Sequence, residues 1–389
     1  MKNNRSHILL ITRITAIACF LSMLLCYKLW LGERAFPLSP IADFLPSLHH
    51  PIDLILFSIT LLLLQCIVFF KNPKKFIVAF LVLALLLALM DQNRWQPWFY
   101  QYLMMFFILA FYDFEGKSNL HSESILLVFK LMIGAIYFWS GLQKLNPNFI
   151  TDTYPWLMEP ITNHLSESAV SKTDWLGKAF PMIEITTSLA LFSNKFKKKA
   201  VVMLFFMHLF ILFVLGPFGH NYNPVIWPWN MAMMAFSAIL FYNSEATSFH
   251  QIKNAFQFHS IKIVILFFVL MPLLNFFNTW DSYLSHNLYS GNTSNGVIYI
   301  SDSVESKLPP EIKQYSKGEM NLNQITIKYW CMMELGVPAY PEKRNFASIT
   351  KSFYKYASDS SEIYFMFTPK LKLNELSRGF TRDNEEVSP

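Results

Sequence analysis

Residues 52–70 read Ile-Asp-Leu-Ile-Leu-Phe-Ser-Ile-Thr-Leu-Leu-Leu-Leu-Gln-Cys-Ile-Val-Phe-Phe, with Asp53 as the one charged side chain. A helix that crosses a bilayer needs about 17–25 mainly apolar residues. Further segments approach that pattern, which gives nine predicted spans: residues 8–31, 52–70, 76–90, 99–114, 124–145, 179–193, 201–219, 225–242 and 261–280. We therefore predict an all-α polytopic membrane bundle. Because three of these segments are short, eight or ten spans stay open as alternatives.

The composition of the whole chain agrees with this fold class. Of its 389 residues, 53% are hydrophobic and 15% are charged, and the mean hydropathy is +0.31. A soluble protein carries about 25% charged residues, so the composition argues against a soluble Rossmann enzyme, a nucleic-acid-binding module and a disordered scaffold. The four cysteines form no Cys-x-x-Cys pair and no Cys/His metal spacing, which argues against thiol-redox chemistry and a zinc site.

Basic residues are concentrated in alternate loops. They precede the first span and follow the second and sixth, at Lys2, Arg5, Lys71, Lys74, Lys75, Lys195, Lys197, Lys198 and Lys199. The positive-inside rule places such loops in the cytoplasm. With nine spans, the N-terminus is then cytoplasmic and the C-terminus extracytoplasmic. The first apolar block is too long for a signal peptide, and we expect it to be retained.

The composition changes after Trp280. The following stretch is polar, with short β-prone runs at residues 297–300, 325–329 and 363–368 and a helical pattern at residues 345–355. We therefore predict two domains. Residues 1–280 form the transmembrane domain, and residues 281–389 form a small extracytoplasmic α+β domain.

Two charged residues near the outer ends of predicted spans are candidate catalytic residues. Lys144 ends the fifth span, where it acts either as a favourable positive charge at a helix C-terminus or as a base or anion anchor. Glu184 lies about one turn into the sixth span, in Pro181-Met-Ile-Glu184. A carboxylate within a span needs a partner, and Lys144 lies at a similar depth. An ion pair that serves structure and one that serves chemistry are both open. His208, in the middle of a span, is expected to bond to a neighbouring helix more readily than to act in catalysis.

Other polar residues are predicted at the same outer level and are candidate ligand-binding residues: Arg94, Gln96, Gln143, His220, Asn221, Asn223 and Asn230. Together with Lys144 and Glu184 they suggest a polar pocket that opens outward between walls of Trp, Phe and Met. Such walls suit a lipidic or quinone-like ligand, although ordinary helix packing produces the same composition.

Four motifs stand out along the predicted spans: Thr12-Arg13-Ile14, Asp91-Gln-Asn-Arg-Trp-Gln-Pro-Trp98, Tyr137-Phe-Trp-Ser-Gly-Leu-Gln-Lys-Leu-Asn146 and the Pro-x-x-Glu of the sixth span. They resemble the bacterial HTTM family, the membrane part shared with vitamin K-dependent γ-glutamyl carboxylase. The run around Lys144 is also similar to DoxX-like membrane proteins. The resemblance covers about residues 8–280.

The resemblance implies that Lys144 matches the lysine taken as the base that deprotonates reduced vitamin K in the carboxylase. It also implies an isoprenoid quinone or related lipid as cofactor, and a bacterial inner membrane as location; an endoplasmic-reticulum membrane would give the same topology. Gln143 replaces the family's neighbouring lysine, and Trp98 stands where the family carries a histidine. With these departures, the resemblance supports a membrane scaffold with an outward lysine site more than it supports γ-carboxylation itself.

The leading hypothesis is thus a membrane protein that uses a quinol or another prenyl lipid to modify or mature an extracytoplasmic substrate. Membrane lipids and an extracytoplasmic protein or peptide are the expected partners, and nucleic acid is not. Two alternatives stay open. One is a non-enzymatic lipid-binding or assembly factor for a secreted partner. The other is a transporter, which is disfavoured because the halves of the chain show no inverted repeat.

Overall fold

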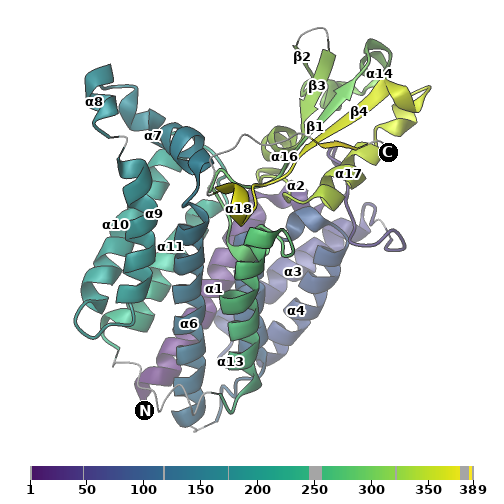
Figure 1. The fold of residues 1–389 in the computed structure, drawn as a ribbon. Helices are drawn as coiled ribbons and strands as arrows, with labels where there is room; N and C mark the ends of the chain where they lie inside the picture. The colour runs from purple at the N-terminus through teal and green to yellow at the C-terminus, as the bar shows by residue number, and fades with distance from the viewer. Residues whose placement is uncertain are drawn as a thin grey trace.

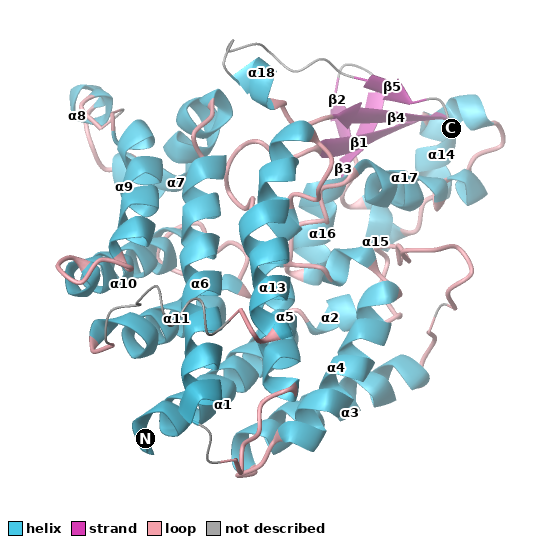
Figure 2. Ribbon diagram, turned by 60° about the horizontal axis from the view of Figure 1, so that its bottom comes forward, coloured by secondary structure: helices cyan, strands magenta, loops and turns pink. Residues whose placement is uncertain are grey.

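The computed structural model describes residues 2–46, 48–116, 119–173, 175–244, 256–319, 322–376 and 385–387. It consists mostly of helices, with a small antiparallel sheet at one end of the helix bundle (Figure 1). The N-terminus lies at the opposite end. We refer to these as the sheet end and the N-terminal end. Figure 2 shows the strands gathered at a single place above the helices. A mainly helical chain with a small C-terminal sheet is therefore confirmed.

Five of the described helices are long and apolar enough to cross a membrane. These membrane-length stretches are Asn4–Leu25 within α1 (Lys2–Leu25), Ile52–Phe69 (α3), Leu120–Gln143 within α6 (Asn119–Gln143), Lys197–Leu215 (α10) and His259–Phe277. The last stretch is built from α13 (His259–Val264), η4 (Ile265–Leu270) and η5 (Met271–Phe277).

The other apolar helices are shorter. They are α2 (Tyr27–Trp30), α4 (Lys74–Leu89), α5 (Pro97–Ala110), α9 (Leu176–Ala190) and α11 (Ile226–Ser237), which continues into the π-helix η3 (Ala238–Tyr242). Helix α5 begins at Pro97 because a proline fits the first helical position, where its missing N–H costs nothing. Each of the predicted segments is therefore helical in the described chain, although only some of the helices have spanning length.

Large apolar side chains point outward from the bundle. Leu62 of α3 is 57% exposed, Val82 of α4 is 57% exposed and Phe206 of α10 is 62% exposed. Soluble proteins rarely expose apolar surface of this extent. Outward apolar faces on helices of this composition are compatible with a membrane protein.

Short helices cover the sheet end beside α9 and α10 (Figure 1). They are η2 (Phe149–Thr153), α7 (Tyr154–Thr162) and α8 (Glu167–Ser171). A short connection, η1 (Gln92–Arg94), joins α4 to α5 at the same end. Asp91 caps η1 by accepting a hydrogen bond from the backbone N–H of Asn93.

The C-terminal part forms a five-stranded antiparallel sheet in the order β2-β3-β1-β4-β5. The strands are β1 (Asn295–Ile300), β2 (Lys317–Glu319), β3 (Leu322–Thr326), β4 (Ile363–Thr368) and β5 (Glu385–Val387). In the central register, Ile298 of β1 lies opposite Ile325 of β3 and Phe365 of β4. The accompanying helices are η6 (Tyr283–Ser285), α14 (Asp302–Lys307), α15 (Pro310–Lys313), α16 (Ile327–Leu335), α17 (Lys343–Lys351), η7 (Tyr354–Tyr356), η8 (Ser360–Glu362) and α18 (Leu373–Leu376).

The predicted strand at residues 325–329 is wrong in its second half. The strand β3 ends at Thr326, and helix α16 begins at Ile327. Ile327, Trp330 and Cys331 recur at helical spacing and are all buried. A short apolar run does not by itself distinguish a strand from a helix. Here the helical spacing of the buried residues continues beyond residue 329, and the segment forms a helix.

The C-terminal part is attached to the helix bundle through buried hydrogen bonds. Oδ1 of Asn93 accepts from the backbone N–H of Tyr340 at 3.0 Å and from Nδ2 of Asn345 at 2.9 Å. Oε1 of Glu334 accepts from the backbone N–H groups of Ala35 and Phe36 at 2.6 and 3.0 Å. These contacts hold the sheet against the sheet end of the bundle.

Candidate functional site

An ion pair joins α6 to α9 at the sheet end. Nζ of Lys144 donates to Oε2 of Glu184 at 2.8 Å, to Oγ of Ser140 at 2.6 Å and to the carbonyl oxygen of Ser140 at 3.2 Å. The side chains of Lys144 and Glu184 are 15% and 10% exposed. An ammonium group has three N–H donors. The three therefore all have acceptors, and the pair is mostly shielded from solvent.

Gly141 allows the two helices to approach closely enough for this pair. A Cβ atom on Gly141 would lie 2.9 Å from Cγ1 of Ile185 and 3.0 Å from the carbonyl oxygen of Pro181, both on α9. One turn away from the pair, Oγ of Ser188 donates to the carbonyl oxygen of Gly134 at 2.8 Å. Small residues on α6 thus set the distance between the helices that carry Lys144 and Glu184.

A cavity of about 140 Å³ lies directly beside the ion pair. Its walls are mainly apolar and come from α6, α7, α9, α10 and α11, with Ile136, Phe180, Met207, Phe210, Ile211 and Met233 among them. An apolar cavity of about 150 Å³ in another protein holds one benzene ring. The cavity therefore has the size and lining expected for a single six-membered ring.

A second polar group lines the same cavity. The hydroxyl of Tyr137 lies 2.6 Å from Nε2 of His208 and 3.2 Å from Oγ of Ser237, and Nδ1 of His208 lies 2.6 Å from Oδ1 of Asn230. Nδ2 of Asn230 donates to the carbonyl oxygen of Ile226 at 2.7 Å, which directs Oδ1 toward the histidine. Because Oδ1 only accepts, the partners assign the proton of the neutral imidazole to Nδ1, and Tyr137 donates to Nε2.

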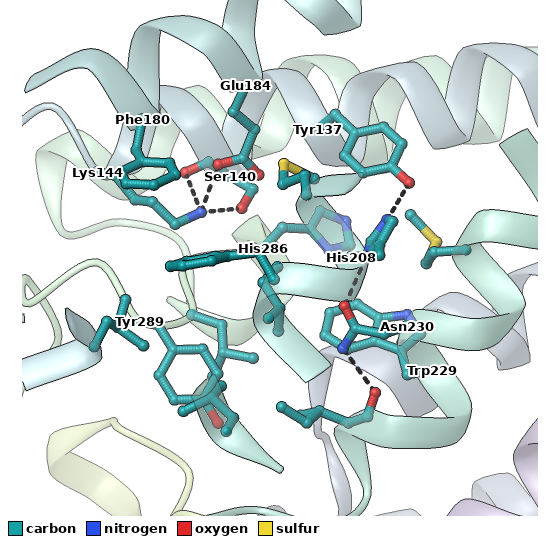
Figure 3. A pocket seen from close by; sticks show the side chains of 18 of the residues that line it. Tyr137, Ser140, Lys144, Phe180, Glu184, His208, Trp229, Asn230, His286 and Tyr289 are labelled. Atoms are coloured by element: carbon teal, nitrogen blue, oxygen red, sulfur yellow. Dashed lines mark hydrogen bonds and ion pairs between the residues drawn. The ribbon is translucent and has the colours of Figure 1, made fainter. Parts of the chain in front are cut away.

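The polar groups face the cavity from several parts of the chain (Figure 3). Ser140 and Tyr137 belong to the helix that carries Lys144, and His208 and Asn230 come from α10 and α11. His286 and Tyr289 come from the segment that follows the last apolar helix. Residues far apart in the sequence therefore meet around one space.

Three of the residues predicted for the site line this cavity: Lys144, Glu184 and Asn230. Asn230 contacts His208 rather than standing free. The structure thus places the two predicted catalytic residues in contact with each other and one predicted ligand-binding residue at the other polar group. Their roles in chemistry or ligand binding stay predictions.

Arg94 and Gln96 lie elsewhere, and among the described residues that line the cavity neither appears. The buried guanidinium of Arg94 donates to three backbone carbonyl groups, those of Leu29, Trp30 and Leu87. Nε2 of Gln96 donates to the carbonyl oxygens of Asn93 and Pro338 at 2.9 Å each. In this structure both side chains bind backbone groups, which holds α2, α4, η1 and the C-terminal part together.

The remaining predicted residues are not among the described residues that line the cavity: Gln143, His220, Asn221 and Asn223. Nε2 of His220 lies 2.6 Å from the carbonyl oxygen of Trp156, and its ring stacks on that indole at 4.4 Å. Asn223 donates to the hydroxyl of Tyr289 at 2.8 Å. Gln143 is buried and Asn221 is exposed. Asn223 therefore contacts a residue that lines the cavity, and His220 contacts Trp156, beside the lining residue Leu157.

Ser140, Tyr137 and His286 line the cavity but are not among the residues predicted for the site. Ser140 precedes Lys144 by one helical turn, a spacing at which side chains of a helix meet, so the motif itself contained that signal. Tyr137 lies one further turn back on the same face. His286 had no such signal, because it stands in a polar stretch outside the predicted spans.

Comparison with known proteins finds no relative: no family model, no curated protein and no solved structure matches the chain. Within the described ranges, no group of three or more His, Cys, Asp or Glu residues is placed to hold a metal ion.

Proposed function

We propose that this chain is a multi-pass membrane protein of the HTTM/DoxX-like type that binds the ring of an isoprenoid quinol, or of another prenyl lipid, in the cavity. It uses this lipid to modify or mature an extracytoplasmic substrate. The observation that carries the proposal is the Lys144–Glu184 pair at the edge of a ring-sized apolar cavity.

The size of the cavity and its polar groups support a ring with oxygens at two positions. A hydroquinone carries two hydroxyl groups on opposite sides of one six-membered ring. The cavity offers Lys144 with Ser140 as one polar group and His208 with Asn230 as the other, separated by apolar walls. Sites for small molecules typically combine a mainly apolar lining with a few polar groups that set the orientation.

Lys144 acts on the bound hydroxyl either as a base or as an anion anchor. As an anchor, its ammonium group exchanges the contact with Ser140 for one to the quinol oxygen. As a base, it first passes a proton from Nζ to Oε2 of Glu184, 2.8 Å away, and then accepts the proton of the hydroxyl. Glu184 is the ion partner in the first case and the proton acceptor in the second.

The distribution of charge supports an orientation with the N-terminus in the cytoplasm. Arg5 donates to the carbonyl oxygen of Phe114, and Lys197 donates to that of Ser244, so these basic residues lie at the N-terminal end. The C-terminal sheet lies at the other end. With the helical segments read as nine spans, the positive-inside rule places the sheet and the Lys144 site outside the cytoplasm. A bacterial inner membrane is the proposed location.

The test is mass spectrometry of small molecules that stay bound to the detergent-purified protein. We expect a stoichiometric isoprenoid quinone in the wild type and its loss in Lys144→Ala. Lys172→Ala is the matched control, because Lys172 is exposed at the same end and does not line the cavity. Equal amounts of bulk phospholipid alone in all three proteins would refute the proposal.

A second candidate is a lipid-binding or assembly factor without catalysis. Two observations favour it: every donor of Lys144 already has an acceptor, and the C-terminal part is firmly attached to the bundle. In that case the C-terminal surface recognises the partner. Substitutions in the cavity would then leave maturation of a secreted partner unchanged, whereas removal of residues 281–389 would abolish it.

A further inference from the structure

His286 is buried, yet among the described residues its ring has no hydrogen-bond partner. The residue is 2% exposed. Within the part of the chain that the structure describes, neither Nδ1 nor Nε2 has a hydrogen-bond partner. Buried polar groups are nearly always paired, since an unpaired one loses its contacts to water without compensation. A histidine with both nitrogens unpaired therefore needs an explanation.

The position of the ring is set by its neighbours. It packs against Phe268 at a centroid distance of 5.1 Å and against Tyr100 at 6.1 Å. The backbone of His286 has a φ of 56°, a left-handed conformation that is uncommon for a residue with a side chain. The next residue, Asn287, secures the segment by donating to Asn275 and to the carbonyl oxygen of Asn292. The ring is thus held in place by packing and by its backbone.

The ring faces the cavity beside Lys144. His286 is one of its lining residues, and Figure 3 shows it between the Lys144–Glu184 pair and His208. Both of its nitrogens lack a partner in the described chain, whereas the Lys144–Glu184 pair and the His208–Asn230 pair beside the same cavity are hydrogen-bonded. A ring ligand in the cavity would offer the partner that His286 lacks.

We infer that His286 binds the ligand directly, through a hydrogen bond between its imidazole and an oxygen of a quinone or quinol ring. This inference rests on the proposed function. A neutral imidazole has one donor and one acceptor nitrogen. In one tautomer the nitrogen that faces the ligand donates to the carbonyl oxygen of a quinone, and in the other it accepts from the hydroxyl of a quinol, so that the imidazole holds the ring in both oxidation states.

The protonation state of His286 agrees with this role. Burial lowers its pKa from the usual 6.5 to about 3, so the ring is neutral throughout the physiological range. A charged imidazolium has two donors and no acceptor, and it would bind the quinone form but not accept from the quinol.

The test uses a ubiquinone with a single isoprenoid unit, added to the full-length protein in detergent. Affinity is measured by titration for the wild type, His286→Phe, His286→Gln and Lys144→Ala. The phenylalanine keeps an aromatic ring for the contacts with Phe268 and Tyr100 and removes both nitrogens. Because a lost hydrogen bond of about 1.4 kcal/mol corresponds to a factor of ten, we expect about tenfold weaker binding by His286→Phe. His286→Gln retains a donor and an acceptor and should bind more tightly than His286→Phe.

The quinone-dependent rise in unfolding temperature separates ligand contact from a structural role. Strain from the left-handed backbone is present with and without quinone and cancels in this difference. We expect a smaller rise for His286→Phe than for the wild type. An equal rise and equal affinity would overturn the inference while the proposed function stands.

Two further outcomes distinguish the inference from the function on which it rests. If the wild type does not bind the quinone, the proposed function and this inference both fail. If His286→Phe weakens binding and Lys144→Ala does not, the assignment of His286 stands and the role proposed for Lys144 fails.

Discussion

Nζ of Lys144 lies 2.8 Å from Oε2 of Glu184. The two residues meet because α6 and α9 approach each other closely at Gly141. Lys144 follows the end of α6 and Glu184 lies within α9. The pair exists because α6 presents Gly141 to α9 where a larger residue would separate the helices. The geometry of the candidate site thus depends on the closeness of one helix contact.

Gly141→Ala should separate α6 from α9. The added Cβ would lie 3.0 Å from a backbone oxygen, which cannot turn aside as a side chain can. We expect the free energy of unfolding to fall by about 1–3 kcal/mol, the usual cost of overpacking. Thermal unfolding in detergent measures it. Gly318→Ala is the control, since its Cβ would meet its nearest atom at an ordinary 3.7 Å. Equal effects of the two substitutions would contradict this account.

Substitutions in the ion pair should distinguish a structural pair from a chemical one. Glu184→Leu leaves the mostly buried ammonium of Lys144 without its counter-ion, and removal of one partner from a buried pair costs about 3–5 kcal/mol. The partial exposure of both side chains places the expected loss at the lower end. The double variant Lys144→Met/Glu184→Leu should recover most of the stability and none of the quinone binding. Full stability of Glu184→Leu alone would show that the pair does not order the helices.

Tyr137→Phe should destabilise the second polar group. The hydroxyl donates to His208, so its removal leaves a buried imidazole nitrogen unpaired, at a cost of about 1–3 kcal/mol. Ser237→Ala is the matched control, because it removes a longer contact to the same hydroxyl and keeps the bond to His208. Chemical or thermal unfolding of both variants gives the comparison. A larger loss in Ser237→Ala than in Tyr137→Phe would argue against the assigned direction of these hydrogen bonds.

Glu342 should make the stability of the C-terminal part depend on pH. Its Oε1 accepts from the backbone N–H of Ser282 at 2.8 Å, and burial is the largest cause that raises the pKa of this carboxyl above 4.5. The folded state therefore holds its proton more tightly than the unfolded state does. The resulting stabilisation is complete below pH 4.5 and is lost as the pH rises through the folded pKa.

Glu342→Gln keeps an oxygen for Ser282 and cannot ionise. As the pH rises from 4 toward 8, its unfolding temperature should increase relative to that of the wild type. This is about the range in which a raised carboxyl pKa lies. Thermal unfolding at a series of pH values measures the difference. A difference that stays constant, or falls as the pH rises, would contradict the raised pKa.

The local elements of this fold could be predicted from the sequence to a large extent. Helix occupies each predicted span, and the predicted strands at residues 297–300 and 363–368 lie within β1 and β4. The error at residues 327–329 has a physical cause, because a short apolar run suits either a strand or a buried helical turn. The number of membrane-spanning helices and their orientation stay predictions, since only some of the described helices have spanning length.

The candidate site was predictable where it contains charged residues, because a charge within an apolar span is energetically unfavourable unless it has a partner. Lys144 and Glu184 were selected because charges near apolar spans need partners, and the two do contact each other. Arg94 and Gln96 were predicted as ligand-binding residues because they are polar and lie at the same outer level, but they bind backbone carbonyl groups. Sequence shows that a polar group needs a partner, and it does not show whether that partner is a ligand or the protein's own backbone.

By itself, the sequence determined that the chain is rich in apolar helices, that a polar C-terminal part follows, and that Lys144 and Glu184 are charged residues in or directly beside apolar helices. These properties depend on composition and spacing within short segments. Only the tertiary structure decided that Tyr137, His208 and Asn230 form one hydrogen-bonded group and that His286 faces the cavity with unpaired nitrogens. The reason is that hydrogen bonds act over about 3 Å, so partners from separate helices are set by how those helices pack.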